Sequence, residues 1–185
     1  MPLPGTGLRA APYPGLLWAG ERCARAGLGT DAMLALVGLV AGAEHGRSAA
    51  DLGRAVRAAL AVAAHLEHRV AEVARPVGLP TGGVVPAATC AAVLTGVPLA
   101  DLPAVLDLAG SLMAVAAPAG PPGPWAGHEP AAGWLAVRSW TSGLAGMPDG
   151  LTRTLAAVTG PVTGPVTGDG LPADVPVRAL LDRLR

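Results

Sequence analysis

The sequence contains no lysine and no phenylalanine, and it has little charge of either sign. Only 14% of its 185 residues are charged, and the 13 basic residues, all arginine, are matched by 13 acidic ones. Without lysine, a catalytic Schiff base on a lysine and a lysine-containing phosphate loop are both excluded. Because the formal net charge is +0, there is no electrostatic case for a nucleic-acid partner.

Cysteine is also scarce, since only Cys23 and Cys90 occur. Two cysteines do not make a disulfide framework, and we interpret them as reduced thiols in a cytoplasmic protein. The longest uncharged run, residues 76–100, is broken by prolines and glycines. This pattern is typical of a buried helix with flanking loops, so we expect no membrane span.

What the chain has in excess is small and apolar residues. It is 51% hydrophobic but only 3% aromatic, and alanine and glycine dominate. A chain of this length suits one domain with a sizeable core. Small side chains let helices approach closely, so we expect tight helix packing rather than filling by aromatic rings. The apolar excess over charge also predicts a homodimer.

Hydrophobic periodicity predicts an all-α fold, an array of antiparallel helical hairpins, because no stretch shows the alternation of a β-strand. Ser48 is expected to start the longest helix, with Asp51 three residues later in a variant of the capping box. Helices are expected over residues 16–26, 30–44, 48–75, 81–95, 98–116, 130–142, 149–158 and 174–185.

Proline and glycine set the expected domain boundaries. Residues 1–15 are predicted to be a disordered N-terminal arm, and residues 16–160 a single helical domain. The duplication PVTGPVTG indicates a Pro/Thr/Gly linker over residues 161–173. The last segment, residues 174–185, is then a C-terminal helix that docks on the core or on a partner.

Two motifs have a simple structural interpretation. His65 and His68 share a helix face at metal-ligand spacing, but no third ligand is evident, so we expect a solvated face and no metal. The sequence TGG at 81–83 opens a helix and can bind an anion through free N–H groups. Simple capping by Thr81 is the favoured interpretation.

Two further sites suit proton transfer. His128 and Glu129 open a helix directly after a Gly/Pro-rich loop, and histidine titrates near neutrality. A carboxylate at a helix start is also ordinary compensation of the helix dipole. Glu67 lies about 60° from the centre of the apolar face of its helix, so it is either a base with a raised pKa or the partner of an arginine across an interface.

Several segments between about residues 27 and 160 resemble, in order, motifs of the MmgE/PrpD family, named for 2-methylcitrate dehydratase. TDAMLALVGLVAGAEHGRSAADLGRAV looks like the family's Ala-rich helix ending in Glu. AVAAHLEHRV is similar to its Gly-Tyr-Glu-x-x-x-Arg helix, with Glu67 at the Glu position. VGLPTGGVVPAATC looks like its Gly-Phe-His-Pro-Thr turn and following helix, and AAGWLAVRSWTSGLAG looks like its Ala-Gly-Ile-x-Ala-Ala segment.

The resemblance implies the family's large helical domain, with the smaller α/β lid absent. Such proteins dehydrate, decarboxylate or epimerise small polycarboxylates without a redox cofactor, and they are usually dimers. Glu67, Pro80 and Thr81 match the family's motifs. Thr30 stands where the first motif has histidine, and Leu79 replaces the histidine of Gly-Phe-His-Pro-Thr.

We therefore expect a divergent, lidless MmgE/PrpD-like enzyme that needs no cofactor. It would perform non-redox proton transfer (dehydration, isomerisation or cyclisation) on a small, largely apolar biosynthetic intermediate. The alternative is a non-catalytic helical module that dimerises or binds a partner chain. The expected catalytic residues are His128, Glu67 and Arg138, and the expected substrate-binding residues are Thr81, Trp125, Glu129 and Trp134.

Overall fold

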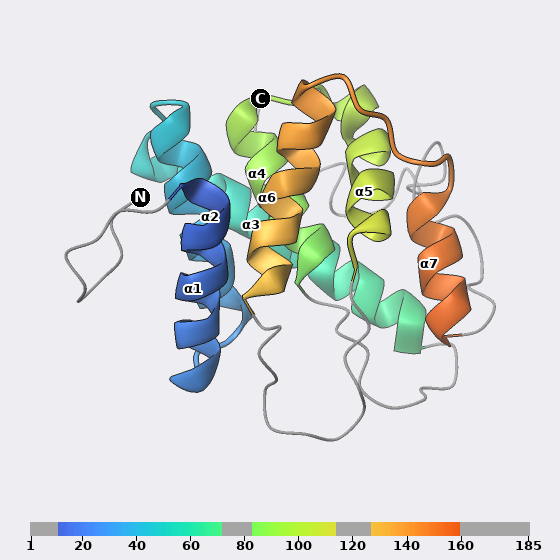
Figure 1. Cartoon of the computed structure of the whole chain (residues 1–185), viewed down its shortest axis with the longest axis horizontal. Helices are drawn as coiled ribbons and strands as arrows, with labels where there is room; N and C mark the ends of the chain where they lie inside the picture. The colour runs from blue at the N-terminus through green and yellow to red at the C-terminus, as the bar shows by residue number, and fades with distance from the viewer. Residues whose placement is uncertain (1–10, 72–82, 114–126, 160–185) are drawn as a thin grey trace.

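A computed structural model describes residues 11–71, 83–113 and 127–159, with side chains described as far as residue 66 in the first range and residue 157 in the last (Figure 1). These residues form seven α-helices and one short 3₁₀ turn, and none of them lies in a strand. The predicted all-α class is confirmed. The helices are α1 (Pro12–Arg25), α2 (Thr30–Glu44), α3 (Ala49–Ala71), α4 (Val84–Thr95), α5 (Leu102–Ser111), α6 (His128–Thr141) and α7 (Gly150–Thr159).

Helix α1 begins at Pro12, inside the segment that the sequence predicted to be a disordered arm. The expectation failed because proline was treated as a helix breaker. The first turn of a helix needs no N–H donors, and the fixed φ of proline suits it, so Pro12 and Pro14 are tolerated there. The four residues 12–15 therefore belong to the helical domain.

Helix α4 is the centre of the fold. It packs against α2, α3, α5 and α6, and Figure 1 shows it surrounded by these neighbours. Nearly every residue of α4 is buried, as its uniformly apolar sequence requires. The hydroxyl of Thr89 donates to the Val85 carbonyl within the helix at 3.0 Å, so this buried polar group has a partner.

Helices α4 and α6 can pack closely at Gly133 because this residue has no side chain. A Cβ atom at Gly133 would be 2.4 Å from the Ala87 Cβ and 2.6 Å from the Val84 carbonyl oxygen. Real Cβ atoms essentially never approach other atoms so closely. At this contact, small residues rather than aromatic rings set the spacing of the two helices.

Helix α5 is shorter than expected, because the helix predicted over residues 98–116 starts as a 3₁₀ turn, Leu99–Asp101, and its regular part ends at Ser111. Pro103 in the first turn fits the later start. The carboxylate of Asp107, in the middle of α5, accepts hydrogen bonds from the backbone N–H groups of Asp149 and Leu151. Asp107 thereby caps the start of α7.

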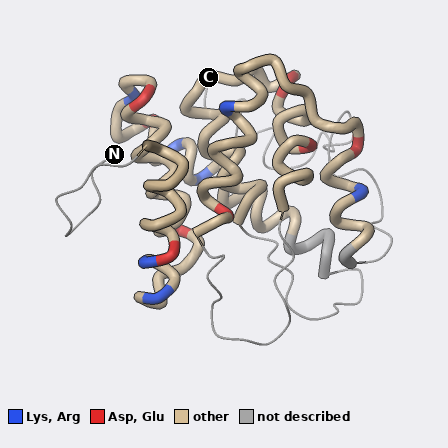
Figure 2. The backbone as a smooth tube through the Cα atoms, viewed as in Figure 1, with Lys and Arg blue, Asp and Glu red and all other residues tan. Residues whose placement is uncertain are grey.

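No helix in the described ranges is long and apolar enough to cross a membrane. Charged residues are sparse along the helices, as the composition requires (Figure 2). The core extends from Leu16 in α1 to Leu155 in α7 as one contiguous cluster. Within the predicted domain of residues 16–160, the described helices therefore share a single core. The predicted linker and C-terminal helix, residues 161–173 and 174–185, lie outside the described residues.

Candidate functional site

The start of α6 is held against α1 by a backbone contact. A Cβ atom at Gly127 would lie 1.9 Å from the Leu17 carbonyl oxygen and 3.0 Å from the Glu21 backbone nitrogen. Gly127 is also the N-cap residue of α6, and no side chain caps this helix. The next two residues, His128 and Glu129, are thus fixed at a junction between helices.

The imidazole of His128 is oriented by the end of α5. Its Nε2 atom lies 2.9 Å from the Leu112 carbonyl oxygen. Because a carbonyl can only accept, Nε2 must carry the proton in this hydrogen bond. In the neutral ring, Nδ1 is then unprotonated and is the atom that can accept a proton. The contact selects one tautomer of a partly buried histidine.

The carboxyl group of Glu129 packs on the backbone at the start of α4. A Cβ atom at Gly83 would lie 1.9 Å from Glu129 Oε2, so the carboxyl occupies the space that the glycine leaves open. Within the described ranges, no hydrogen bond or ion pair holds this carboxyl group. Burial raises its pKa from 4.5 to about 7, because the charged form loses its hydration.

A second carboxyl group comes from α1. Glu21 Oε1 accepts a hydrogen bond from Arg25 Nε at 3.0 Å, while Glu21 Oε2 is buried without a partner. Leu17 and Glu21 lie one helical turn apart, so they share the face of α1 that contacts Gly127. His128 thus lies beside the end of α5 and Glu129 beside the start of α4, while Glu21 belongs to the face of α1 that meets Gly127.

The structure does not bring Arg138 to this junction. Arg138 lies ten residues beyond His128 in α6, or about 15 Å along the helix axis. Its exposed guanidinium lies 5.7 Å above the Trp134 ring, and Trp134 Nε1 donates to Glu44 Oε2 at 2.9 Å. Arg138 and Trp134 thus belong together, but away from His128 and Glu129.

Three of the predicted site residues cannot be placed. The side chain of Glu67 lies outside the described residues, and so do Thr81 and Trp125. Of the histidine pair 65 and 68, only His65 has a described side chain, and it is partly buried. Among the described residues, no group of three or more His, Cys, Asp or Glu side chains is arranged to hold a metal ion.

Sequence reasoning missed one polar site. A groove of about 230 Å³ lies at the end of α4, beside the turn that joins α2 to α3. Gly83 and Gly96 flank the two ends of α4, about 20 Å apart along the helix, so the groove is far from Glu129. The only signal for this groove in the sequence was the Ser48–Asp51 capping motif, since Asp51 lines the groove.

Comparison of the chain with protein-family models, with curated proteins and with solved structures gave no match.

Proposed function

We propose that the chain is an enzyme of non-redox proton-transfer chemistry, with its reacting groups at the start of α6. The observation that carries the proposal is the Glu129 carboxyl group, half-buried against Gly83 without a counter-charge and with its pKa raised to about 7. At neutral pH such a group is ionised in about half of the molecules, so it can both give and take a proton. Groups with strongly shifted pKa values cluster at functional sites.

His128 supplies the complementary group. Its Nε2–H is engaged by the Leu112 carbonyl, so Nδ1 is the atom that accepts a proton from a substrate. Glu129, the next residue, can then return a proton to the product as a general acid. Backbone N–H groups at the uncapped start of α6 can stabilise negative charge that develops on a substrate oxygen.

The surroundings favour a small, largely apolar substrate. The two groups contact the backbone of Gly83 and the carbonyl of Leu112, which carry no charge. Of the two arginines of α1, Arg25 is paired with Glu21 and Arg22 lies over the Trp18 ring. The chemistry expected from the MmgE/PrpD resemblance, a dehydration, isomerisation or cyclisation without a redox cofactor, is consistent with these groups. Arg138 has no part in this proposal because it lies at the other end of α6.

Deuterium exchange tests the proposal without knowledge of the natural substrate. The protein is incubated in D₂O with a panel of small ketones, β-keto esters and β-hydroxy acids, and NMR detects deuterium at carbon. An enzyme that abstracts a carbon-bound proton exchanges it even when no net product forms. Replacing a general acid–base group typically lowers the rate by about 10²–10⁴-fold, and we expect this for Glu129→Gln and His128→Asn.

Glu44→Gln is the matched control, because Glu44 is a carboxylate bonded to Trp134 and distant from His128. It should leave the exchange rate unchanged. Exchange that is equally fast in the wild type, Glu129→Gln and His128→Asn would refute the assignment of the chemistry to this junction.

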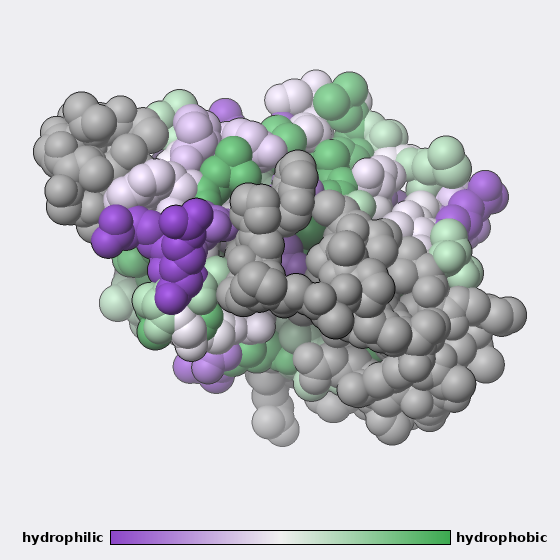
Figure 3. Space-filling view, turned by 60° about the horizontal axis from the view of Figure 1, so that its bottom comes forward, coloured by the Kyte–Doolittle hydropathy of each residue, from purple (hydrophilic) through white to green (hydrophobic). Residues whose placement is uncertain are grey.

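A second candidate function is a non-catalytic module that dimerises or binds a partner. It is favoured by four apolar side chains that are at least half exposed: Leu28, Leu39, Leu144 and Met147. Figure 3 shows green apolar atoms at several places on one face of the molecule. Light scattering on the wild type and on Leu39→Ser tests it: a dimer that Leu39→Ser dissociates supports the module, and a monomer at high concentration contradicts self-association.

A further inference from the structure

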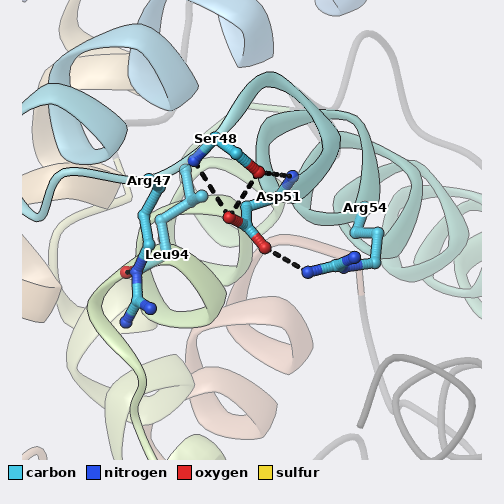
Figure 4. Close-up of polar contacts among 5 residues, drawn as sticks. All are labelled: Arg47, Ser48, Asp51, Arg54 and Leu94. Carbon is cyan, nitrogen blue, oxygen red and sulfur yellow. Dashed lines mark hydrogen bonds and ion pairs between the residues drawn. The ribbon is translucent and has the colours of Figure 1, made fainter.

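The groove at the end of α4 has a mixed lining of charged and apolar groups. It lies between the last turn of α4 and the first turn of α3, and Figure 4 shows the polar contacts along it. Its volume, about 230 Å³, is below the usual range for drug-sized ligands, so it suits a molecule of only a few carbon atoms. The lining residues are Arg47, Asp51, Arg54, Val93, Leu94 and Gly96.

The guanidinium of Arg47 is fixed in place by the end of α4. Its Nε atom donates to the Leu94 carbonyl at 2.7 Å, which gives a partner to a carbonyl in the last turn of the helix. Its Nη2 atom lies 3.2 Å from the position of a Cβ at Gly96, whose φ of +82° ends the helix. In the described part of the chain, the two Nη groups have no acceptor. They remain free to donate to a ligand.

The second arginine is already paired. Arg54 Nη2 contacts Asp51 Oδ1, while Asp51 Oδ2 accepts from the Ser48 N–H at 2.9 Å and from the Ser48 hydroxyl at 2.7 Å (Figure 4). The Ser48 hydrogen bonds and the two nearby arginines hold the pKa of Asp51 below its usual value. Asp51 therefore stays ionised and offsets the charge of Arg54. The positive charge of Arg47 is left unbalanced in the groove.

We propose that this groove binds a small monocarboxylate with a short branched apolar stem. The carboxylate pairs with the Nη groups of Arg47, whose planar fork matches two carboxylate oxygens. The stem lies against Val93, which is partly exposed in the lining, whereas the Leu94 side chain is buried in the core and contributes only its carbonyl group. Because Arg47 is held in place before the ligand arrives, little of its side-chain freedom is lost on binding.

This site is separate from the proton-transfer groups. The groove lies at one end of α4 and Glu129 at the other, so a ligand in the groove cannot be the molecule that reacts at His128. The groove is thus a second binding site, and it does not depend on the proposed reaction. A carboxylate bound there bridges the α2–α3 turn and α4, and it stabilises the folded chain by mass action.

Titration with isovalerate, followed by backbone NMR, tests the proposal. Saturable shifts at Arg47, Val93 and Gly96 are expected, and isovaleramide, which has the same shape without the charge, should give none. Inorganic phosphate is the second arm, because it shares the negative charge but has no apolar stem. Phosphate binding as tight as isovalerate binding would overturn the carboxylate assignment, and so would shifts that rise linearly without saturation.

Variants locate the contacts. Arg47→Gln should weaken isovalerate binding about tenfold or more, the size expected for the loss of a charged hydrogen bond. Arg25→Gln, which removes an arginine on α1, is the matched control and should bind like the wild type.

Since Arg47 also bonds to the Leu94 carbonyl, Val93→Ala provides a test that leaves this contact intact. It should weaken isovalerate binding but not acetate binding, and equal affinity for isovalerate in Val93→Ala and the wild type would overturn the proposed pose.

Discussion

Asp107 is buried and Glu129 is half-buried, and the two regions treat a carboxyl group in opposite ways. Asp107 accepts two backbone hydrogen bonds, from Asp149 and Leu151, and so ties α5 to the start of α7. Glu129 packs on the backbone of Gly83, and within the described ranges no hydrogen bond holds it. The hydrogen bonds of Asp107 stabilise the fold. Ionisation of Glu129 near neutral pH lowers the free energy of unfolding, because the charged carboxylate has lost part of its hydration.

The contrast between Asp107 and Glu129 distinguishes a carboxyl group with a structural role from one that is a candidate for function. A buried charge that is fully hydrogen-bonded is explained by the stability it provides. A half-buried carboxyl group without such partners has only the dipole at the start of α6 to favour its charged form, so a functional explanation is worth testing. Proton transfer is one that its pKa of about 7 fits. Three substitutions can break or sharpen this comparison.

The largest effect is expected for Asp107→Ala. It leaves the N–H groups of Asp149 and Leu151 without acceptors at a buried junction, where Gly146 and Gly150 pack directly against Asp107. Each hydrogen bond to a charged group contributes about 1.5–3 kcal/mol, so we expect a loss of about 4 kcal/mol in the free energy of unfolding. Urea denaturation at neutral pH measures it. If the variant were as stable as the wild type, the hydrogen bonds of Asp107 would not stabilise the α5–α7 junction.

For Glu129→Gln we expect the free energy of unfolding to rise rather than fall. Because burial raises the pKa of Glu129 above its unfolded value of 4.5, the folded protein binds this proton more tightly than the unfolded chain. The stability of the wild type should therefore fall as the pH rises from about 4.5 to about 7 and level off above. A shift from 4.5 to about 7 corresponds to about 3 kcal/mol at most.

Glu129→Gln removes that ionisation, so it should be more stable than the wild type at about pH 8 and show a flatter stability profile. Thermal unfolding across this pH range measures the difference, with Glu44→Gln as the control for loss of a carboxylate elsewhere. Should Glu129→Gln prove less stable at about pH 8, the carboxylate has a stabilising partner and belongs with Asp107. Lost exchange activity together with raised stability is the outcome that the proposed function requires.

The smallest effect is expected for Ser48→Ala. Ser48 Oγ accepts from the Asp51 N–H at 3.2 Å, and the Ser48 N–H donates back to the Asp51 carboxylate. This cap is exposed, so water can replace the lost bonds, and the loss should be about 1 kcal/mol. Circular dichroism during thermal unfolding measures it. If Ser48→Ala lowered the free energy of unfolding as much as Asp107→Ala, burial would not explain the difference expected between an exposed cap and a buried one.

Features set by neighbouring residues were predictable from the sequence. The capping pair of Ser48 and Asp51, the end of α4 at Gly96 and the start of α6 near His128 all depend on residues within one helical turn. The structure confirms each of them. The start of α1 was wrong for a local reason, because Pro12 suits the first helical turn.

Features set by distant residues were not predictable. The burial of Glu129 depends on Gly83, and the cap of α7 on Asp107. Likewise, Arg47 meets the Leu94 carbonyl across 47 positions in the sequence. Nothing in the pattern around any one of these residues indicates the other member of the pair. The candidate site was thus located by its histidine, but the state of its carboxyl group required the three-dimensional packing.

The hydrogen bond between His128 and the Leu112 carbonyl has a consequence for engineering the chain length. It holds the end of α5 and the start of α6 beside each other, so the connection between them closes a loop whose ends are already fixed. For such a loop, each doubling of length costs only about 0.6 kcal/mol of closure entropy. Lengthening the connection between these two helices should therefore cost little stability, provided that His128 keeps its carbonyl partner.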